Sequence, residues 1–157
     1  MRDAEVSARR ELGLGAEAST ISRLARDLET DYHATLDRFL ALEAMGSADP
    51  RAELRHLRAL AFARGEPQLR VLQEGLRILE TTDRRAALPD LAVPSVWIGG
   101  RRDRLVPPGA LAWSAAQCAG SYSEIHDAGH APFFHQTALV IQALAPLLAP
   151  APQRVPS

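Results

Sequence analysis

The sequence has a single cysteine, few aromatic residues and almost no net charge, and these shortages exclude several classes of protein. Cys118 alone cannot form an internal disulfide or a multi-cysteine zinc site, and such usage fits a reducing cytoplasm. The formal net charge of -1 gives no overall field that would attract nucleic acid or an anionic membrane. No stretch approaches the length of apolar sequence that a membrane-spanning helix needs. The charged start of the chain is unlike a secretory signal, so we expect a soluble cytoplasmic protein.

Apolar residues in the first half of the chain follow a helical period. They recur at spacings of three and four over Ile21–Leu40, which predicts one amphipathic helix ending at Met45–Gly46. Asp49–Pro50 predicts the start of a second helix, because an aspartate N-cap and a proline at the first position favour initiation. A third apolar stripe covers Leu69–Leu79. Residues 17–87 are therefore predicted to form a helical unit.

The sequence changes character after residue 88, where short apolar runs alternate with helical patterns. Val93–Gly100 predicts a buried parallel strand, and a helix is predicted over 108–118. Tyr122–His126 predicts a second strand, and a last helix is predicted over 135–148. The order strand, helix, strand, helix predicts an α/β unit over 88–150.

Two parallel strands are too few for a complete parallel sheet, because both of its faces and both of its edges need to be covered. We therefore expect residues 88–150 to form the C-terminal edge of a larger sheet. Residues 1–16 contain no clear strand and stay unassigned, and residues 151–157 are predicted to be a frayed tail. Open strand edges also predict self-association or a complementing chain.

Two residues after the predicted strands could carry acid–base chemistry. Asp103 follows the first strand and His130 follows the second, so both lie in loops beyond the carboxyl ends of the strands. A carboxylate there can accept the Nδ1 proton of the imidazole and stabilise the imidazolium formed when Nε2 takes a proton. Each residue alone is usually structural, as a turn or cap residue. Their combination with Gly129 and Pro132–Phe133 predicts a catalytic pair.

This arrangement resembles the end of the α/β-hydrolase superfamily, in which the acid follows one strand and the histidine loop follows the next. The helical unit over 17–87 resembles the lid, or cap, of that superfamily, followed by the last two parallel strands and their helices. A narrower likeness, over roughly residues 25–148, is to the pimeloyl-[acyl-carrier-protein] methyl ester esterase family of biotin synthesis. It rests on Arg38–Leu42, Met45–Gly46, Leu76–Leu79, Asp83–Arg85 and His130–Phe133.

The resemblance implies further site residues and a partner, but no cofactor and no metal. The acyl channel would be lined by Phe39, Leu40, Ala41, Leu42 and Glu43, together with His130. Arg38, Arg51 and Arg55 would receive an acidic acyl-carrier protein and its phosphopantetheine-linked acyl ester. Independently of the resemblance, Arg51, Arg55 and Arg58 share one helix face, which suits either an acidic partner or plain solvation. Ala34 departs from the family pattern, which has another arginine there.

The family's serine nucleophile, in a G-x-S-x-G turn, has no counterpart in the sequence, and neither has its oxyanion loop. No serine has the flanking glycines, and Cys118 comes after the acid, in the wrong chain order. We therefore expect the chain alone not to hydrolyse esters. Three hypotheses stay open: part of an ester hydrolase of the biotin-pathway type, a non-catalytic protein that binds acyl-carrier protein, or part of another α/β-hydrolase.

Overall fold

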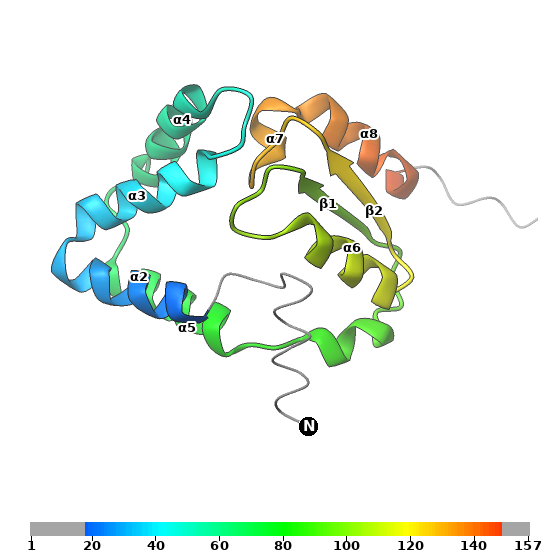
Figure 1. Cartoon of the computed structure of the whole chain (residues 1–157), viewed down its shortest axis with the longest axis horizontal. Coiled ribbons are helices and arrows are strands. Elements are labelled where there is room, and N and C mark those ends of the chain that lie inside the picture. The colour runs from blue at the N-terminus through cyan, green and yellow to red at the C-terminus, as the bar shows by residue number, and fades with distance from the viewer. Residues whose placement is uncertain (1–17, 149–157) are drawn as a thin grey trace, which may run out of the picture.

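The computed structural model describes residues 18–148, which form a helical cap beside a small α/β core (Figure 1). The cap contains α2 (Ala18–Thr30), α3 (Tyr32–Ala44), α4 (Pro50–Phe62) and α5 (Leu69–Thr81). The core contains η1 (Arg85–Asp90), β1 (Val96–Gly100), α6 (Pro108–Gln117), β2 (Ser121–Ile125), α7 (Pro132–His135) and α8 (Thr137–Leu148). The unassigned segment 1–16 and the tail 151–157 lie outside the described residues. Within residues 18–148, every helix is too short or too polar to cross a bilayer.

The prediction of one helix over Ile21–Leu40 is wrong, because the chain forms two helices that separate at Asp31. The backbone of Asp31 has a φ of -150°, outside the helical region, and its carboxylate accepts a hydrogen bond from the Ala34 N–H at 3.3 Å. Asp31 is thus the N-cap of α3. Hydrophobic spacing cannot reveal such a break when the apolar stripes of two consecutive helices stay in phase.

The other two cap helices begin and pack as their sequences indicate. Asp49 caps α4 by accepting a hydrogen bond from the Ala52 N–H at 2.9 Å, as predicted from the Asp49–Pro50 pair. Helix α5 packs against α2, and α4 packs against α3. The buried cluster between α3 and α4 consists of Leu36, Leu40, Ala44 and Leu57, and Phe134 of the core packs against it. The interior of the cap is therefore continuous with the core.

The two predicted strands pair in parallel, with Val96 opposite Ser121 and Gly100 opposite Ile125. Helix α6 connects them and packs against both, and α8 packs against β1. The buried strand predicted over Val93–Gly100 begins only at Val96, and only its end, Gly99–Gly100, is buried. Val96, Trp97 and Ile98 are half-buried. Within residues 18–148, β2 is the only strand that pairs with β1, so the other edge of β1 has no neighbouring strand.

The last predicted helix is present as α8, and a short helix that the sequence analysis did not predict precedes it. The short helix α7 ends at His135, and α8 begins at Thr137 after a break at Gln136, whose φ is -117°. The prediction of a helix over 135–148 is therefore confirmed apart from its first two residues. The break leaves α7 directly after the loop that carries His130, where it contacts the cap through Phe134.

Candidate active site

Asp103 lies in the loop after β1 and is held by the backbone of that loop. Its Oδ1 accepts hydrogen bonds from the N–H groups of Leu105 at 2.8 Å and Val106 at 3.0 Å. Its Oδ2 lies 2.9 Å from His130 Nδ1, and the side chain is 3% exposed. Burial alone would raise the pKa of Asp103, but the hydrogen bonds from His130 and the two backbone N–H groups outweigh it and lower the pKa below its ordinary value.

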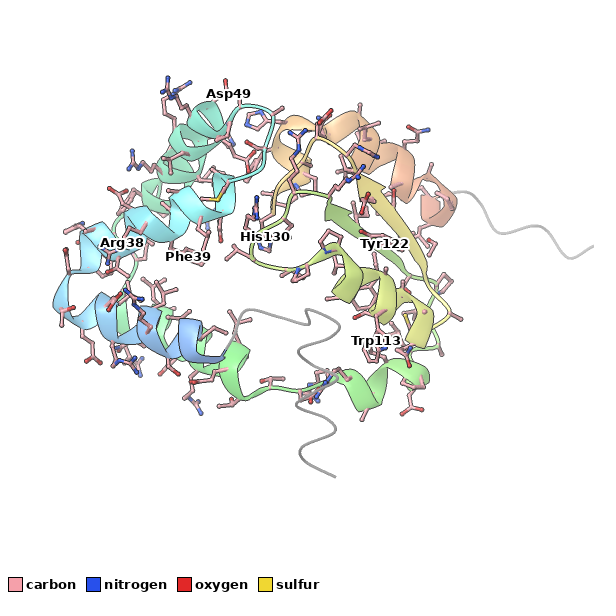
Figure 2. The ribbon with its side chains drawn as sticks, in the orientation of Figure 1. Arg38, Phe39, Asp49, Trp113, Tyr122 and His130 are labelled. Carbon is pink, nitrogen blue, oxygen red and sulfur yellow. The ribbon has the colours of Figure 1, made fainter. Side chains whose placement is uncertain are left out.

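His130 lies in the loop between β2 and α7, with Nδ1 directed to Asp103. The hydrogen bond to Asp103 is the main reason that the pKa of His130 is raised; burial opposes it, and the charges of Asp103, Glu43 and Glu53 add to it. The imidazole is half-buried, and it lines a cavity between cap and core (Figure 2). The predicted pairing of the two loops is confirmed by this 2.9 Å contact. An imidazole held this way can exchange protons through Nε2.

A turn of the cap, Met45–Ser47, packs directly on the loops that carry Asp103 and His130 (the functional loops). Gly46 has a φ of +90°, and a Cβ atom there would lie 2.4 Å from the carbonyl oxygen of Arg102, next to Asp103. A Cβ atom on Gly129, next to His130, would lie 2.5 Å from the carbonyl oxygen of Met45. Glycine is required at both places because the backbones approach too closely for a side chain. The cap therefore shares a backbone interface with the acid and histidine loops.

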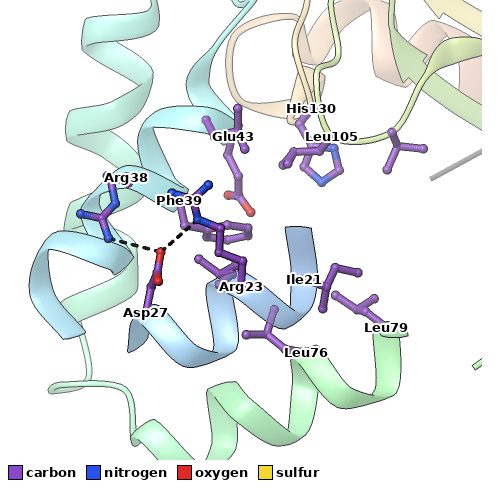
Figure 3. Close-up of a pocket in the computed structure, with 13 residues that line it drawn as sticks. Ile21, Arg23, Asp27, Arg38, Phe39, Glu43, Leu76, Leu79, Leu105 and His130 are labelled. Atoms are coloured by element: carbon purple, nitrogen blue, oxygen red, sulfur yellow. Dashed lines mark ion pairs between the residues drawn. The ribbon is translucent and has the colours of Figure 1, made fainter. Parts of the chain in front are cut away.

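The cavity has a volume of about 600 Å³ and lies between α2, α3, α5 and the functional loops (Figure 3). Three residues of the predicted acyl channel, Phe39, Leu42 and Glu43, line it together with His130. The other two lie elsewhere, because Leu40 packs in the buried cluster of the cap and Ala41 is exposed. The remaining lining residues are Ile21, Arg23, Leu24, Asp27, Arg38, Leu76, Leu79, Leu105 and Val106. Most of the cavity wall is thus apolar.

The predicted arginines occupy two different settings. Arg38 lines the cavity, donates a hydrogen bond to Thr35 Oγ1 at 2.7 Å and lies 3.9 Å from Asp27. Arg51 and Arg55 are exposed on α4, where the described residues offer them no ion pair. Arg58 is not free as its helix face suggested, because its Nε lies 2.8 Å from Asp37. The patch of cations on α4 therefore consists of two arginines rather than three.

Sequence reasoning missed Glu53, a carboxylate buried between cap and core. Its side chain is 2% exposed, its Oε2 lies 3.7 Å from His135 Nε2, and its Oε1 has no hydrogen-bond partner. The Ser47 hydroxyl lies nearby without meeting the geometry of a hydrogen bond. Burial raises the pKa of Glu53, and Ser47, His135 and His130 offset this only in part. Glutamate in a charged helix is ordinarily exposed, so no sequence signal indicated this position.

The site as described has an acid and a base but no nucleophile beside them. Across residues 21–148, no serine or cysteine side chain forms a hydrogen bond with the His130 ring. Ser7 and the side chain of Ser19 lie outside the part of the chain whose side chains are described. The described geometry is therefore suited to moving a proton through His130, with Asp103 placed to stabilise the charged imidazole. It identifies no attacking group.

The class of fold follows from the loops and the cap together. An acid after one parallel strand, a histidine after the next and a helical cap packed on both loops form a C-terminal portion of an α/β-hydrolase fold. In agreement, the chain matches the structure of an esterase from Exiguobacterium antarcticum with a TM-score of 0.71, at 16% identity, covering 83% of this chain and 48% of that one. This likeness establishes the fold alone.

Sequence comparison gives a narrower relationship, to pimeloyl-[acyl-carrier protein] methyl ester esterases. The chain is 48% identical over 139 residues to that of Stenotrophomonas maltophilia strain K279a, covering 86% of this chain and 54% of the relative. It is 47% identical over 137 residues to that of Xanthomonas campestris pv. campestris strain B100, covering 87% and 54%. The chain thus spans about half the length of these relatives. No protein-family model matches the sequence.

Proposed function

We propose that the chain supplies the cap, the acid and the general base of a carboxylic ester hydrolase. Its substrate would be the methyl ester of a pimeloyl group carried on acyl-carrier protein. The observation that carries the proposal is the 2.9 Å contact between His130 Nδ1 and Asp103 Oδ2 at the wall of a largely apolar cavity. The names of the relatives supply the substrate.

In this reaction His130 moves the proton and Asp103 stabilises the charge that results. As a serine oxygen bonds to the ester carbonyl carbon, its proton passes to His130 Nε2. The imidazolium returns that proton to the methoxy oxygen, so methanol leaves and an acyl-serine remains. Water then attacks the acyl carbon by the same route, which releases the free carboxyl group and restores the serine. The lowered pKa of Asp103 keeps the carboxylate ionised opposite the imidazolium throughout.

The cavity suits the acyl part of such a substrate. Phe39, Leu42 and Leu105 are among the apolar side chains that line it, and about 600 Å³ is within the usual range for small-molecule sites. An aliphatic chain buried there would leave its ester end near His130. We therefore assign the substrate-binding role to Phe39, Leu42 and Glu43, and a packing role to Leu40.

The carrier protein would dock on the exposed face of α4. Arg51 and Arg55 are one turn apart on that helix, and neither forms an ion pair with an acidic side chain of the described residues, although the charge of Arg55 acts on Asp49. Free guanidinium groups suit acidic and phosphorylated partners because they form bidentate, charge-assisted hydrogen bonds. Arg38 lines the cavity, where it would contact the phosphopantetheine group that carries the acyl ester.

The nucleophile would come from a polypeptide segment outside this chain, and the free edge of β1 is the place for it to join. A parallel strand added there would extend the sheet and cover the half-buried residues Val96, Trp97 and Ile98. On this proposal the chain alone does not turn over esters. The second candidate is a carrier-binding protein without catalysis. It is favoured because, within residues 21–148, no hydroxyl or thiol pairs with the His130 ring.

A complementation assay separates these candidates. The chain is mixed or co-expressed with the part of the Stenotrophomonas esterase that it does not match, and hydrolysis of p-nitrophenyl butyrate is followed. We expect turnover in the mixture only, lost by about 10⁴-fold or more in His130→Ala. Turnover by the chain alone would contradict the need for a second segment. Carrier-protein binding without turnover in any mixture would favour the second candidate.

A further inference from the structure

The cavity contains an acidic side chain on its catalytic side. Glu43 projects from α3 into the cavity that His130 enters from the core loop (Figure 3). It is half-buried and has no ion-pair or hydrogen-bond partner among the described residues. A carboxylate without a partner in a mostly apolar wall costs free energy, so its presence at this position needs an explanation.

On the other side of the cavity, positively charged side chains outnumber negatively charged ones. Arg23 and Arg38 both lie near Asp27, at 3.8 Å and 3.9 Å, so two guanidinium groups share one carboxylate. Figures 2 and 3 place Arg38 beyond Phe39 as seen from His130. The cavity is therefore polarised, with a surplus of negative charge near His130 and a surplus of positive charge away from it.

We propose that Glu43 is a specificity-determining residue that excludes an anionic group from the His130 end of the cavity. The inference rests on the proposed function and adds a substrate rule to it: the reacting end must be a neutral ester, and an anionic group is accepted only at the arginine end. Ester hydrolysis converts a neutral ester into a carboxylate. Glu43 then faces that product with like charge, which favours its release.

The ionisation of Glu43 agrees with this role. Burial is the main reason that its pKa is raised, His130 opposes the shift, and the charges of Glu53 and Asp103 add to it. A further anion beside Glu43 would have to be bound together with a proton or at an electrostatic cost. A neutral ester carries no such cost.

The test compares two ligands of equal chain length on the full chain. Monomethyl pimelate offers one neutral end and one anionic end, whereas pimelate is anionic at both ends. Binding at the cavity is followed by NMR through the His130 imidazole resonances at pH 7.5. We expect monomethyl pimelate to bind more tightly than pimelate, and the ratio of the two Kd values to fall by about tenfold in Glu43→Gln.

Matched variants separate the role of Glu43 from general charge effects. Glu74→Gln removes the same charge from the exposed face of α5 and should leave the ratio unchanged, and Glu43→Asp should largely preserve it. A ratio that stays the same in Glu43→Gln overturns the charge role while leaving the hydrolase proposal intact. If neither ligand perturbs His130, the cavity is not the acyl site, which contradicts the proposed function and this inference together.

Discussion

Gly100 and Gly129 lie so close that a Cβ atom on Gly100 would stand 2.1 Å from the carbonyl oxygen of Gly129. These glycines belong to the end of β1 and to the histidine loop, so their contact brings Asp103 and His130 within hydrogen-bonding distance. The Arg102 N–H, which donates to the Ala128 carbonyl oxygen at 3.0 Å, joins the same two loops. The geometry of the acid–histidine pair thus depends on backbone packing as much as on the two side chains.

Gly100→Ala is expected to separate the two loops and lower stability by about 1–3 kcal/mol, the range for overpacking of a well-packed interior. The contact is with backbone atoms, which cannot move aside as a flexible side chain can. Urea denaturation measures the loss of stability. The NMR resonance of the His130 imidazole shows whether its hydrogen bond with Asp103 is kept. Gly75→Ala is the control: its Cβ atom meets nothing within 4 Å in α5, so helix propensity should stabilise the chain by about 0.5–1 kcal/mol. Equal effects of the two substitutions would contradict the packing argument.

Asp103→Asn should lower the pKa of His130, because the hydrogen bond to Asp103 is the main cause of its elevation. An NMR titration of the imidazole measures this directly. Asp127→Asn is a matched control, since Asp127 pairs with Arg102 at 2.8 Å on the exposed side of the same loops. In the complemented enzyme, Asp103→Asn should also lower kcat by about 10⁴-fold. An unchanged titration would mean that the two side chains do not interact in solution.

The same pair should stabilise the fold over a defined pH window. The pKa of Asp103 is lowered, so its contribution is present above its ordinary value of 3.8 and is lost as the pH falls. The pKa of His130 is raised, so its contribution is present below its ordinary value of 6.5 and is lost as the pH rises through the higher folded value. Asp103→Asn should therefore cost more unfolding free energy at pH 5.5 than at pH 8.5, as measured by urea denaturation. The reverse order would overturn this assignment.

Glu53→Gln should stabilise the chain at neutral pH. The pKa of Glu53 is raised by burial, so folding favours its neutral form and stability falls as the pH rises and the group ionises. An amide of the same shape carries no charge, so it removes the cost of ionising a buried group. Thermal unfolding at pH 4 and pH 7.5 should show a larger gain at pH 7.5. Destabilisation at pH 7.5 would instead indicate that the contact with His135 outweighs burial.

Leu40→Ala should cost about 2–5 kcal/mol, because Leu40 belongs to the buried cluster that joins α3 to α4. Its neighbour Ala41 is exposed, so Ala41→Ser should change stability by no more than about 0.5 kcal/mol. Chemical denaturation of the two variants compares a packing position with a surface position in the same turn. If both substitutions lowered stability by the same amount, Leu40 would not be the packing residue that the structure indicates.

Charge reversal of Arg51 and Arg55 to glutamate should abolish binding of acyl-carrier protein while leaving the fold intact, because both side chains are exposed. Fluorescence anisotropy of a labelled carrier protein at low and high salt measures the effect, and wild-type binding should weaken as salt rises. Arg58→Glu is the comparison, since Arg58 is engaged by Asp37 and should matter less for the carrier. Undiminished binding by the double variant would remove α4 as the docking face.

The strands, most helices and the Asp103–His130 pair could be predicted because each leaves a local sequence signature. Helix periodicity, the Asp49–Pro50 cap and the position of each loop after a parallel strand need no knowledge of distant contacts. The break at Asp31 was missed because in-phase apolar stripes conceal it. The burial of Glu53 and the direction of Glu43 depend on how the cap lies on the core, which no local pattern records. For the same reason, the sequence cannot show that Leu40 packs inside the cap whereas Leu42 lines the cavity.

The turn Met45–Ser47, pressed against Gly129 and Arg102, limits how this architecture can be re-engineered. A cap transplanted from another protein of this fold would need a glycine with positive φ at the position of Gly46. Its backbone would also have to lie at the same distance from the loop that carries His130. The helices that line the cavity could be exchanged more freely than this turn. Experiments that graft a different cap onto this core should therefore keep residues 45–47 together with the loops that carry Asp103 and His130.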